Sequence, residues 1–123
     1  MALKSGREYI ESLRSLKPEI YFMGERIASV VDHPATRPHV NAAAMTYELA
    51  LDPQYEDLLT ATSHLSGAKI NRFTHIPQST DDLVRKVKML RALGQRTGTC
   101  FQRCVGMDAL IALSGVAYEM DEK

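Results

Sequence analysis

The sequence is organised around Thr97-Gly98-Thr99-Cys100-Phe101-Gln102-Arg103-Cys104-Val105-Gly106-Met107-Asp108, which contains its only two cysteines. Cys100 and Cys104 are four residues apart, and an apolar, helix-compatible run follows through Tyr118. Four residues are slightly more than one helical turn. We therefore expect one helix that carries both thiols on the same side and continues to about Glu119.

Two thiols at this spacing have several possible roles. They are small buried apolar residues in the plainest interpretation, because unpaired cysteine is often found in cores. Alternatively they bind a metal or an iron–sulfur cluster, which usually needs four ligands, so that this pair supplies two of them. A redox dithiol usually has C-x2-C spacing, which disfavours that role. The histidines, which are the other candidate metal ligands, are scattered along the sequence: His33, His39, His64 and His75.

Composition predicts one ordinary globular domain over residues 1–123. Apolar residues make up 45% and charged residues 24% of the sequence, and the formal net charge is zero. Nothing here favours a nucleic acid or an anionic membrane as the partner. No apolar run approaches the roughly 20 residues of a transmembrane helix. The first residues lack the apolar stretch of a signal peptide, so we expect a cytoplasmic protein with reduced thiols.

Local signals predict short elements in the first half. Ser5 and Glu8 have the spacing of a capping box, which predicts a helix over 6–16 that Pro18 ends. Bulky apolar residues flank a Gly24-Glu25 pair and predict a hairpin of two short strands over 19–30. The sequence turns helix-forming over about 38–51. Asp52-Pro53 then resembles an N-cap and a first-turn proline, which predicts a short helix through about 59.

The second half is predicted to be a loop followed by long helices. Residues 60–78 are expected to be mostly loop, with 68–73 extended. Ser79 is a good N-cap for a helix over about 80–96 that Gly98 breaks or kinks. The apolar face expected for this helix consists of Leu83, Val87, Leu90 and Leu93, and its polar outer face of Arg91, Gln95 and Arg96. Met107 and Met120 are expected in the core.

The last segment is apolar on more than one side and is predicted to be helical almost to Lys123. Such a helix is normally buried all round. We therefore expect this chain to dock onto a missing C-terminal part or a companion subunit.

Four further stretches carry a resemblance. They are Gly6-Arg7-Glu8-Tyr9-Ile10-Glu11-Ser12-Leu13, Ile20-Tyr21-Phe22-Met23-Gly24-Glu25-Arg26-Ile27, Val31-Asp32-His33-Pro34-Ala35-Thr36-Arg37-Pro38 and Met45-Thr46-Tyr47-Glu48-Leu49-Ala50. In this order they resemble the N-terminal part of the 4-hydroxyphenylacetate 3-hydroxylase / 4-hydroxybutyryl-CoA dehydratase family. The stretch Thr99–Asp108 resembles its dehydratase branch, which has cluster cysteines that the flavin-dependent aromatic hydroxylases lack.

The resemblance implies a fold and a chemistry. The fold is mainly α, with a helical N-terminal domain of an acyl-CoA dehydrogenase-like protein whose β middle domain and C-terminal helical bundle are absent here. Dehydratase relatives bind FAD and a [4Fe–4S] cluster, form homotetramers, and convert 4-hydroxybutyryl-CoA to crotonyl-CoA through radical intermediates; they also isomerise vinylacetyl-CoA. Cys100 and Cys104 match two cluster ligands, and Gln102 matches a glutamine near the substrate and the cluster.

The resemblance also implies what is missing. A third cysteine and a histidine ligand, spaced H-x6-C, lie in the absent part, so the chain alone is expected to be inactive. One alternative is a fragment of a flavin-dependent aromatic hydroxylase. Another is a non-catalytic assembly module whose thiols are merely buried.

Overall fold

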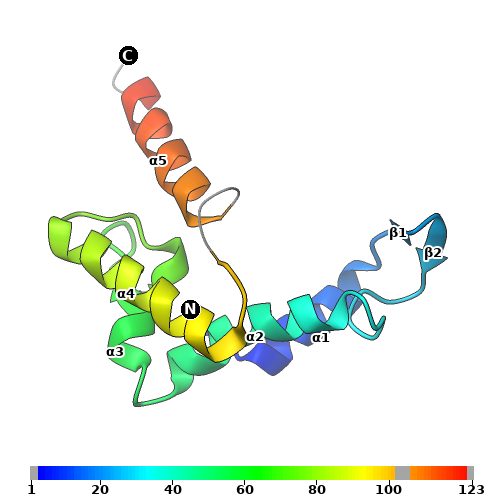
Figure 1. The fold of residues 1–123 in the computed structure, drawn as a ribbon. Helices are drawn as coiled ribbons and strands as arrows, with labels where there is room; N and C mark the ends of the chain where they lie inside the picture. Colours follow the sequence, from blue (N-terminus) through cyan, green and yellow to red (C-terminus); the bar gives the residue numbers. More distant parts are fainter. Residues whose placement is uncertain (1–2, 102–105, 122–123) are drawn as a thin grey trace.

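Two antiparallel helices, α1 (Gly6–Leu16) and α2 (Arg37–Leu51), form an arm that ends in a small hairpin (Figure 1). The computed structural model describes residues 3–101 and 106–121. Strands β1 (Ile20–Phe22) and β2 (Glu25–Ile27) pair antiparallel with Phe22 opposite Glu25, so Met23 and Gly24 form the turn. The predicted hairpin is confirmed, with its turn one residue earlier than expected.

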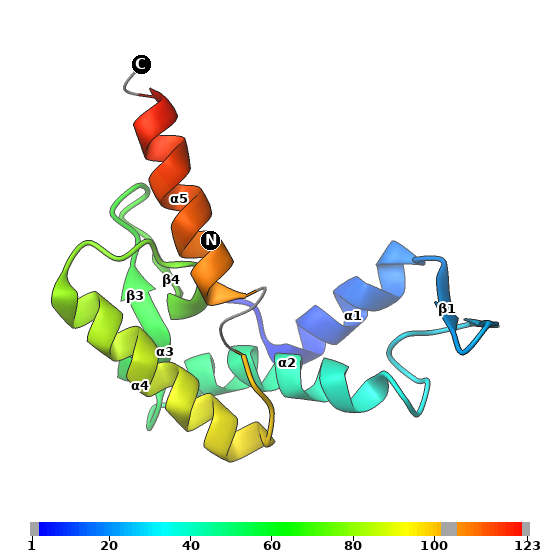
Figure 2. The same ribbon diagram turned by 45° about the horizontal axis from the view of Figure 1, so that its top comes forward.

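The remaining elements lie at the other end of α2. They are α3 (Glu56–Leu59), β3 (Thr60–Thr62), β4 (Lys69–Asn71), the 3₁₀ turn η1 (Arg72–Thr74), α4 (Thr80–Thr97) and α5 (Met107–Asp121). Helix α4 packs on α2 and α3, whereas α5 stands away from them in both views (Figures 1 and 2). The described chain is therefore mainly helical, as predicted, and has two small hairpins, of which only the first was predicted. None of its described helices has the length and apolar character that crossing a bilayer requires.

The core lies where α2, α3, α4 and the start of α5 meet. Its buried members are Leu49, Ala50, Leu59, Met89, Leu93 and Met107. The prediction for Met107 is confirmed, whereas Met120 is exposed and the prediction for it is wrong within this chain.

The predicted apolar face of α4 is confirmed for Leu93, which is buried, and for Leu90, which packs against the core cluster, but not for its other two residues. Lys86, Met89 and Leu93 are the buried residues of this helix, while Leu83 and Val87 are exposed. The spacing of three and four residues between the buried positions defines one helical face. A second stripe of exposed apolar side chains therefore remains on α4.

Two other predictions were wrong in detail. The segment 60–78 was expected to be mostly loop with 68–73 extended; β4 confirms an extended stretch there, but its pairing with Thr60–Thr62 as a second hairpin was not predicted. Asp52 does not cap a helix at Pro53; its Oδ1 accepts a hydrogen bond from the Gln54 N–H in a turn, and α3 begins only at Glu56. The capping box at Ser5 and the N-cap at Ser79 are confirmed.

Gly6 is the point of closest approach between α1 and α2. A Cβ added there would lie 2.9 Å from the Ala44 carbonyl oxygen and 2.7 Å from Glu48 Oε1. Glu48 can move, but the backbone of α2 cannot do so cheaply. Gly6→Ala is therefore expected to destabilise the chain by about 1–3 kcal/mol, measured by urea unfolding.

The matched control is Gly115→Ala in α5, where an added Cβ meets no atom within 4 Å. Because alanine favours helix more than glycine does, this control should be neutral or stabilising by up to about 1 kcal/mol. Equal effects of the two substitutions would contradict the close approach at Gly6.

An ion pair joins α1 to the connection between β2 and α2. Arg14 Nη1 donates to Asp32 Oδ2 at 2.5 Å and Nη2 donates to Oδ1 at 2.8 Å, while Ser29 Oγ donates to Oδ2 at 2.7 Å. Arg14, then Ser29, lowers the pKa of Asp32 to about 2. The folded pKa lies below the unfolded one, so the contribution of this carboxylate to stability is present above about pH 4 and is lost as the pH falls through about 2.

An NMR titration of the Asp32 carboxyl carbon should therefore show a midpoint near pH 2. In Arg14→Gln the midpoint should rise toward about 3.9, the usual value for aspartate. Arg7→Gln, which changes an exposed arginine of the same helix, should leave it unchanged. A wild-type midpoint already near 4 would rule out the ion pair in solution.

Candidate functional site

Cys100 lies in the segment that joins α4 to α5, and it is not helical. Helix α4 ends at Thr97 and α5 begins at Met107. The expectation that one helix carries both cysteines is therefore wrong for Cys100. Cys104 and Gln102 lie outside the described residues, so their predicted placement stays a prediction.

The local chemistry explains why the helix stops before Cys100. Gly98 adopts φ 66°, the left-handed conformation of a helix C-cap, and its N–H donates to the Gly94 carbonyl. Thr97 Oγ1 donates to the Leu93 carbonyl at 2.8 Å and lies 2.6 Å from Thr99 Oγ1. Since glycine adopts this conformation without strain, the turn after α4 is set by Gly98 and held by two hydroxyl groups.

The residue that follows Cys100, Phe101, is held in place by packing against the core cluster. Phe101 packs edge-to-face on Phe73 with ring centroids 6.0 Å apart, and both rings contact the core cluster. Cys100 itself is exposed. The interpretation of this thiol as a buried core residue is therefore not supported within the described chain.

A groove of about 530 Å³ runs between α4 and the Cys100 segment. Val87, Leu90, Arg91 and Gly94 form its α4 side, and Cys100 lies on the opposite side. These four positions are spaced three, one and three residues apart, which places them on one face of a helix. The groove thus combines a thiol, a guanidinium and apolar walls.

Arg91 is exposed, as expected for the polar outer face, and it also lines this groove. Arg96, expected on the same face, lies 5.1 Å from the ring centroid of Tyr55, and its Nε donates to the Tyr55 hydroxyl at 2.9 Å. Arg96 therefore has a structural partner. Sequence reasoning missed the role of Arg91, although its spacing of nine residues from Cys100, with Gly94 between, was visible.

A second groove of about 420 Å³ lies between α1, α2 and β4. Tyr9 and Tyr47 stack in it with ring centroids 4.7 Å apart. Phe73 and Phe101 also line it, so Phe101 belongs to both grooves. Burial and the neighbouring Tyr47 raise the pKa of Tyr9. The aromatic walls suit an extended apolar group, and Lys4 and Lys69 also line the groove.

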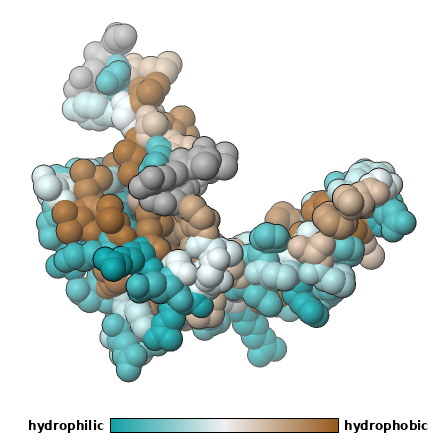
Figure 3. All heavy atoms as spheres, in the orientation of Figure 1, coloured by the Kyte–Doolittle hydropathy of each residue, from teal (hydrophilic) through white to brown (hydrophobic). Residues whose placement is uncertain are grey.

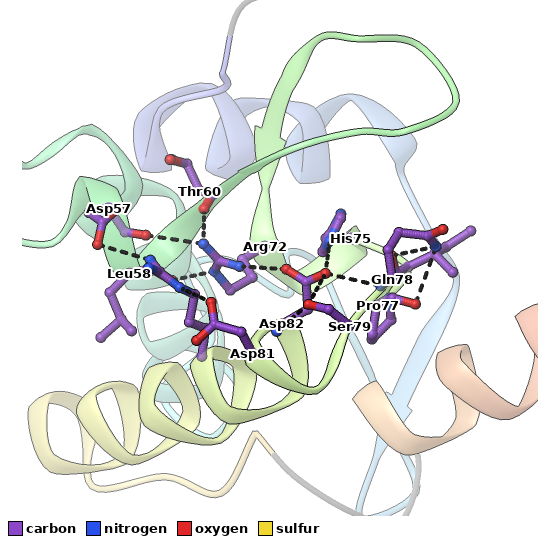
Figure 4. Close-up of polar contacts among 12 residues, drawn as sticks. Asp57, Leu58, Thr60, Arg72, His75, Pro77, Gln78, Ser79, Asp81 and Asp82 are labelled. Atoms are coloured by element: carbon purple, nitrogen blue, oxygen red, sulfur yellow. Dashed lines mark hydrogen bonds and ion pairs between the residues drawn. The ribbon is translucent and has the colours of Figure 1, made fainter.

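A buried polar cluster joins η1 to the start of α4 (Figure 4). Arg72 Nε donates to the Leu58 carbonyl at 2.8 Å, and Nη2 donates to the carbonyls of Asp57 and Thr60 at 3.1 and 2.5 Å. Its Nη1 lies 3.7 Å from Asp82 Oδ1. Burial, followed by the nearby Arg85, lowers the pKa of Arg72.

Asp82 is the acceptor at the centre of this cluster. Its Oδ2 accepts from the Gln78 N–H at 3.0 Å and from Ser79 Oγ at 3.3 Å, and lies 3.3 Å from His75 Nε2. The hydrogen bond from the Gln78 N–H is the main reason why the pKa of Asp82 is lowered. The cluster fixes the beginning of α4, the helix that lines the groove beside Cys100.

The described residues supply only part of a metal site. Over 3–101 and 106–121, no three His, Cys, Asp or Glu side chains come together in a way that could hold an ion. Cys100 is one exposed cysteine, and an iron–sulfur cluster needs about four ligands. Any cluster at this position thus requires donors beyond the described residues.

Residues 5–123 match the family described as 4-hydroxyphenylacetate 3-hydroxylase N terminal. The chain belongs to this family. Within it, the chain is 58% identical over 121 residues to the 4-hydroxybutyryl-CoA dehydratase/vinylacetyl-CoA-Δ-isomerase of Clostridium aminobutyricum, which covers 98% of this chain and 25% of that protein. The family resemblance and its dehydratase relative are thereby confirmed.

Solved structures of the family have the same fold. The archaeal 4-hydroxybutyryl-CoA dehydratase from N. maritimus superposes with a TM-score of 0.88 at 52% identity, over 98% of this chain and 24% of that one. The oxygenase component of a 4-hydroxyphenylacetate 3-monooxygenase, in complex with FAD, gives 0.65 at 29% identity over 76% of this chain and 19% of that one. The chain thus spans about a quarter of the length of its dehydratase relatives.

Proposed function

We propose that residues 1–123 form the N-terminal helical domain of an enzyme that dehydrates 4-hydroxybutyryl-CoA to crotonyl-CoA and isomerises vinylacetyl-CoA. The observation that carries the proposal is the 58% identity, over 98% of the chain, to a dehydratase/isomerase. The 4-hydroxyphenylacetate 3-monooxygenase oxygenase component of Thermus thermophilus is 32% identical over only 68% of the chain. We call a protein in which this sequence continues to the full length of its dehydratase relatives the complete enzyme.

Cys100 and Cys104 are the ligands that we assign to a [4Fe–4S] cluster. The exposure of Cys100 at a groove supports the assignment, because cluster iron needs an accessible sulfur. The other two ligands come from the rest of the complete enzyme. The cluster and FAD supply the one-electron chemistry that removal of an unactivated hydrogen requires.

The other residues of this chain bind and orient the substrate. Arg91 faces the groove that Cys100 lines, where its planar guanidinium can donate two hydrogen bonds to a carbonyl or an anionic group. Gln102 is proposed to donate a hydrogen bond to substrate beside the cluster. Val87 and Leu90 give the same groove an apolar wall.

The uncovered apolar surface supports a docking role for the chain. On the face shown in Figure 3, apolar atoms collect over α4 and along α5. The exposed side chains on α5 are Leu110, Leu113, Val116, Tyr118 and Met120. We propose that the remainder of the complete enzyme, or a companion subunit, covers them; the homotetramer and the cytoplasmic location stay predictions.

The second candidate is the N-terminal part of a flavin-dependent aromatic hydroxylase. The likeness to an FAD-bound oxygenase component favours it, and so does the aromatic groove of Tyr9, Tyr47, Phe73 and Phe101. This candidate needs flavin but gives no role to iron.

Cofactor analysis of the complete enzyme separates the two candidates. Purified without oxygen, it should contain about four iron atoms and one FAD per chain and form crotonyl-CoA from 4-hydroxybutyryl-CoA. A protein that holds flavin without iron, and that hydroxylates 4-hydroxyphenylacetate with reduced flavin and oxygen, would instead establish the hydroxylase.

A further inference from the structure

Lys86 is buried in the middle of α4 without a partner. It is 1% exposed and is one of the largest fully buried side chains. Among the described residues its only recorded electrostatic attraction is to Asp82, with no hydrogen bond or ion pair to that carboxylate. Burial, then the nearby Arg72, lowers the pKa of Lys86. An ammonium group in this position needs an anion or a second acceptor to offset its desolvation.

The carboxylate of Asp82, which is near Lys86, already has other hydrogen-bond and ion-pair partners. Asp82 lies one turn before Lys86 and attracts it electrostatically. However, its Oδ2 accepts from Gln78 and Ser79 and faces His75, and its Oδ1 faces Arg72. Asp82 is therefore shared, and the other carboxylates near Arg72, those of Asp57 and Asp81, pair with Arg85.

A cavity of about 160 Å³ lies beside Lys86, between η1 and the first turns of α5. Phe73, Leu110 and Ile111 are its main apolar walls, and Lys86, His75 and Ser114 are polar wall residues. Ser114 Oγ already donates to the Leu110 carbonyl. His75 is 5% exposed, and its Nδ1 has no hydrogen-bond partner among the described residues.

We infer that this cavity is a binding site for one carboxylate group, which pairs with Lys86. The carboxylate accepts hydrogen bonds from Lys86 Nζ and offsets the cost of burying its ammonium group. His75 Nδ1 makes a second polar contact, directly when it is protonated or through one water. The site is too small for a nucleotide cofactor, because pockets for drug-sized ligands take about 300–1,000 Å³. The inference does not depend on the proposed function.

The first test uses acetate as the probe on the 123-residue chain. Compared with chloride at the same ionic strength, acetate should raise the midpoint of thermal unfolding. The rise should saturate, and it should be about 5 °C at an acetate concentration ten times the dissociation constant. Lys86→Met should abolish this rise, whereas Lys88→Met, which removes an exposed lysine of the same helix, should keep it. A rise that Lys86→Met retains, or no rise beyond that with chloride, overturns the inference.

A second measurement needs no variant. The ¹⁵N resonance of Lys86 Nζ in the wild-type chain should shift saturably with acetate and not with chloride. An Nζ resonance that stays unchanged up to saturating acetate overturns the inference independently of how Lys86→Met folds.

The complete enzyme then identifies the source of the carboxylate. If an acidic side chain of the remaining polypeptide fills the site, Lys86→Met lowers the thermal midpoint more than Lys88→Met does, and acetate has no effect. If the site takes a free carboxylate, acetate still raises the midpoint of the wild type. Identical behaviour of the two variants together with no effect of acetate contradicts both sources.

Discussion

Cys100→Ser in the complete enzyme is expected to remove most of the iron and to leave the flavin in place. A serine hydroxyl is not deprotonated at neutral pH and is a poor ligand for cluster iron, which thiolates hold. Substitutions of groups that only support a metal ligand already cost roughly 10–100-fold in affinity or activity. Loss of a ligand itself should therefore reduce dehydratase activity by more than about 100-fold.

The measurement is iron and acid-labile sulfide per flavin, followed by the rate of crotonyl-CoA formation. Gln95→Ser is the matched control, because it places serine on an exposed position of α4 close to the same turn. Cys104→Ser should behave like Cys100→Ser. Iron content that both cysteine variants retain would remove these residues from the cluster, whether or not the protein is a dehydratase.

Arg72→Met is expected to destabilise the chain by about 3–5 kcal/mol, as loss of one partner from a buried charged network does. Methionine keeps much of the volume of the arginine stem but donates no hydrogen bond. The carbonyls of Asp57, Leu58 and Thr60 would lose their donor, and Asp82 would lose a cation 3.7 Å away. Each buried acceptor left unpaired costs about 1–3 kcal/mol.

Urea unfolding of the chain, followed by circular dichroism, measures this effect. Arg85→Met is the matched control: Arg85 pairs with Asp57 and Asp81 at a more exposed position of α4. Exposed ion pairs are worth about 0–1 kcal/mol, so the control should change little. If Arg72→Met is no more destabilising than Arg85→Met, the guanidinium does not hold η1 to α3.

Local signals in the sequence predicted the helices that begin with a cap. Ser5 with Glu8, and Ser79 with acids behind it, satisfy helix N–H groups through neighbouring residues alone, so sequence suffices to place α1 and α4. The strand at Thr60–Thr62 was missed because three residues carry little strand signal of their own. The strand is stabilised by its pairing with Lys69–Asn71, which the local sequence does not reveal.

The candidate site was predicted in its residue types and not in its geometry. Gly98 was recognised as a breaker, but the hydroxyl pair of Thr97 and Thr99 that holds the non-helical turn was not. Lys86 occupies the buried face of α4 with Met89 and Leu93, against the general expectation that lysine is exposed. Only the tertiary environment, including the cavity under α5, distinguishes such a lysine from a solvated one.

One aromatic ring makes the two grooves inseparable. Phe101 forms part of the wall beside Cys100 and part of the wall opposite Tyr9 and Tyr47. A larger side chain at this position narrows both hollows, and a smaller one widens both. Any substitution of residue 101 that is designed to reshape one groove therefore reshapes the other as well.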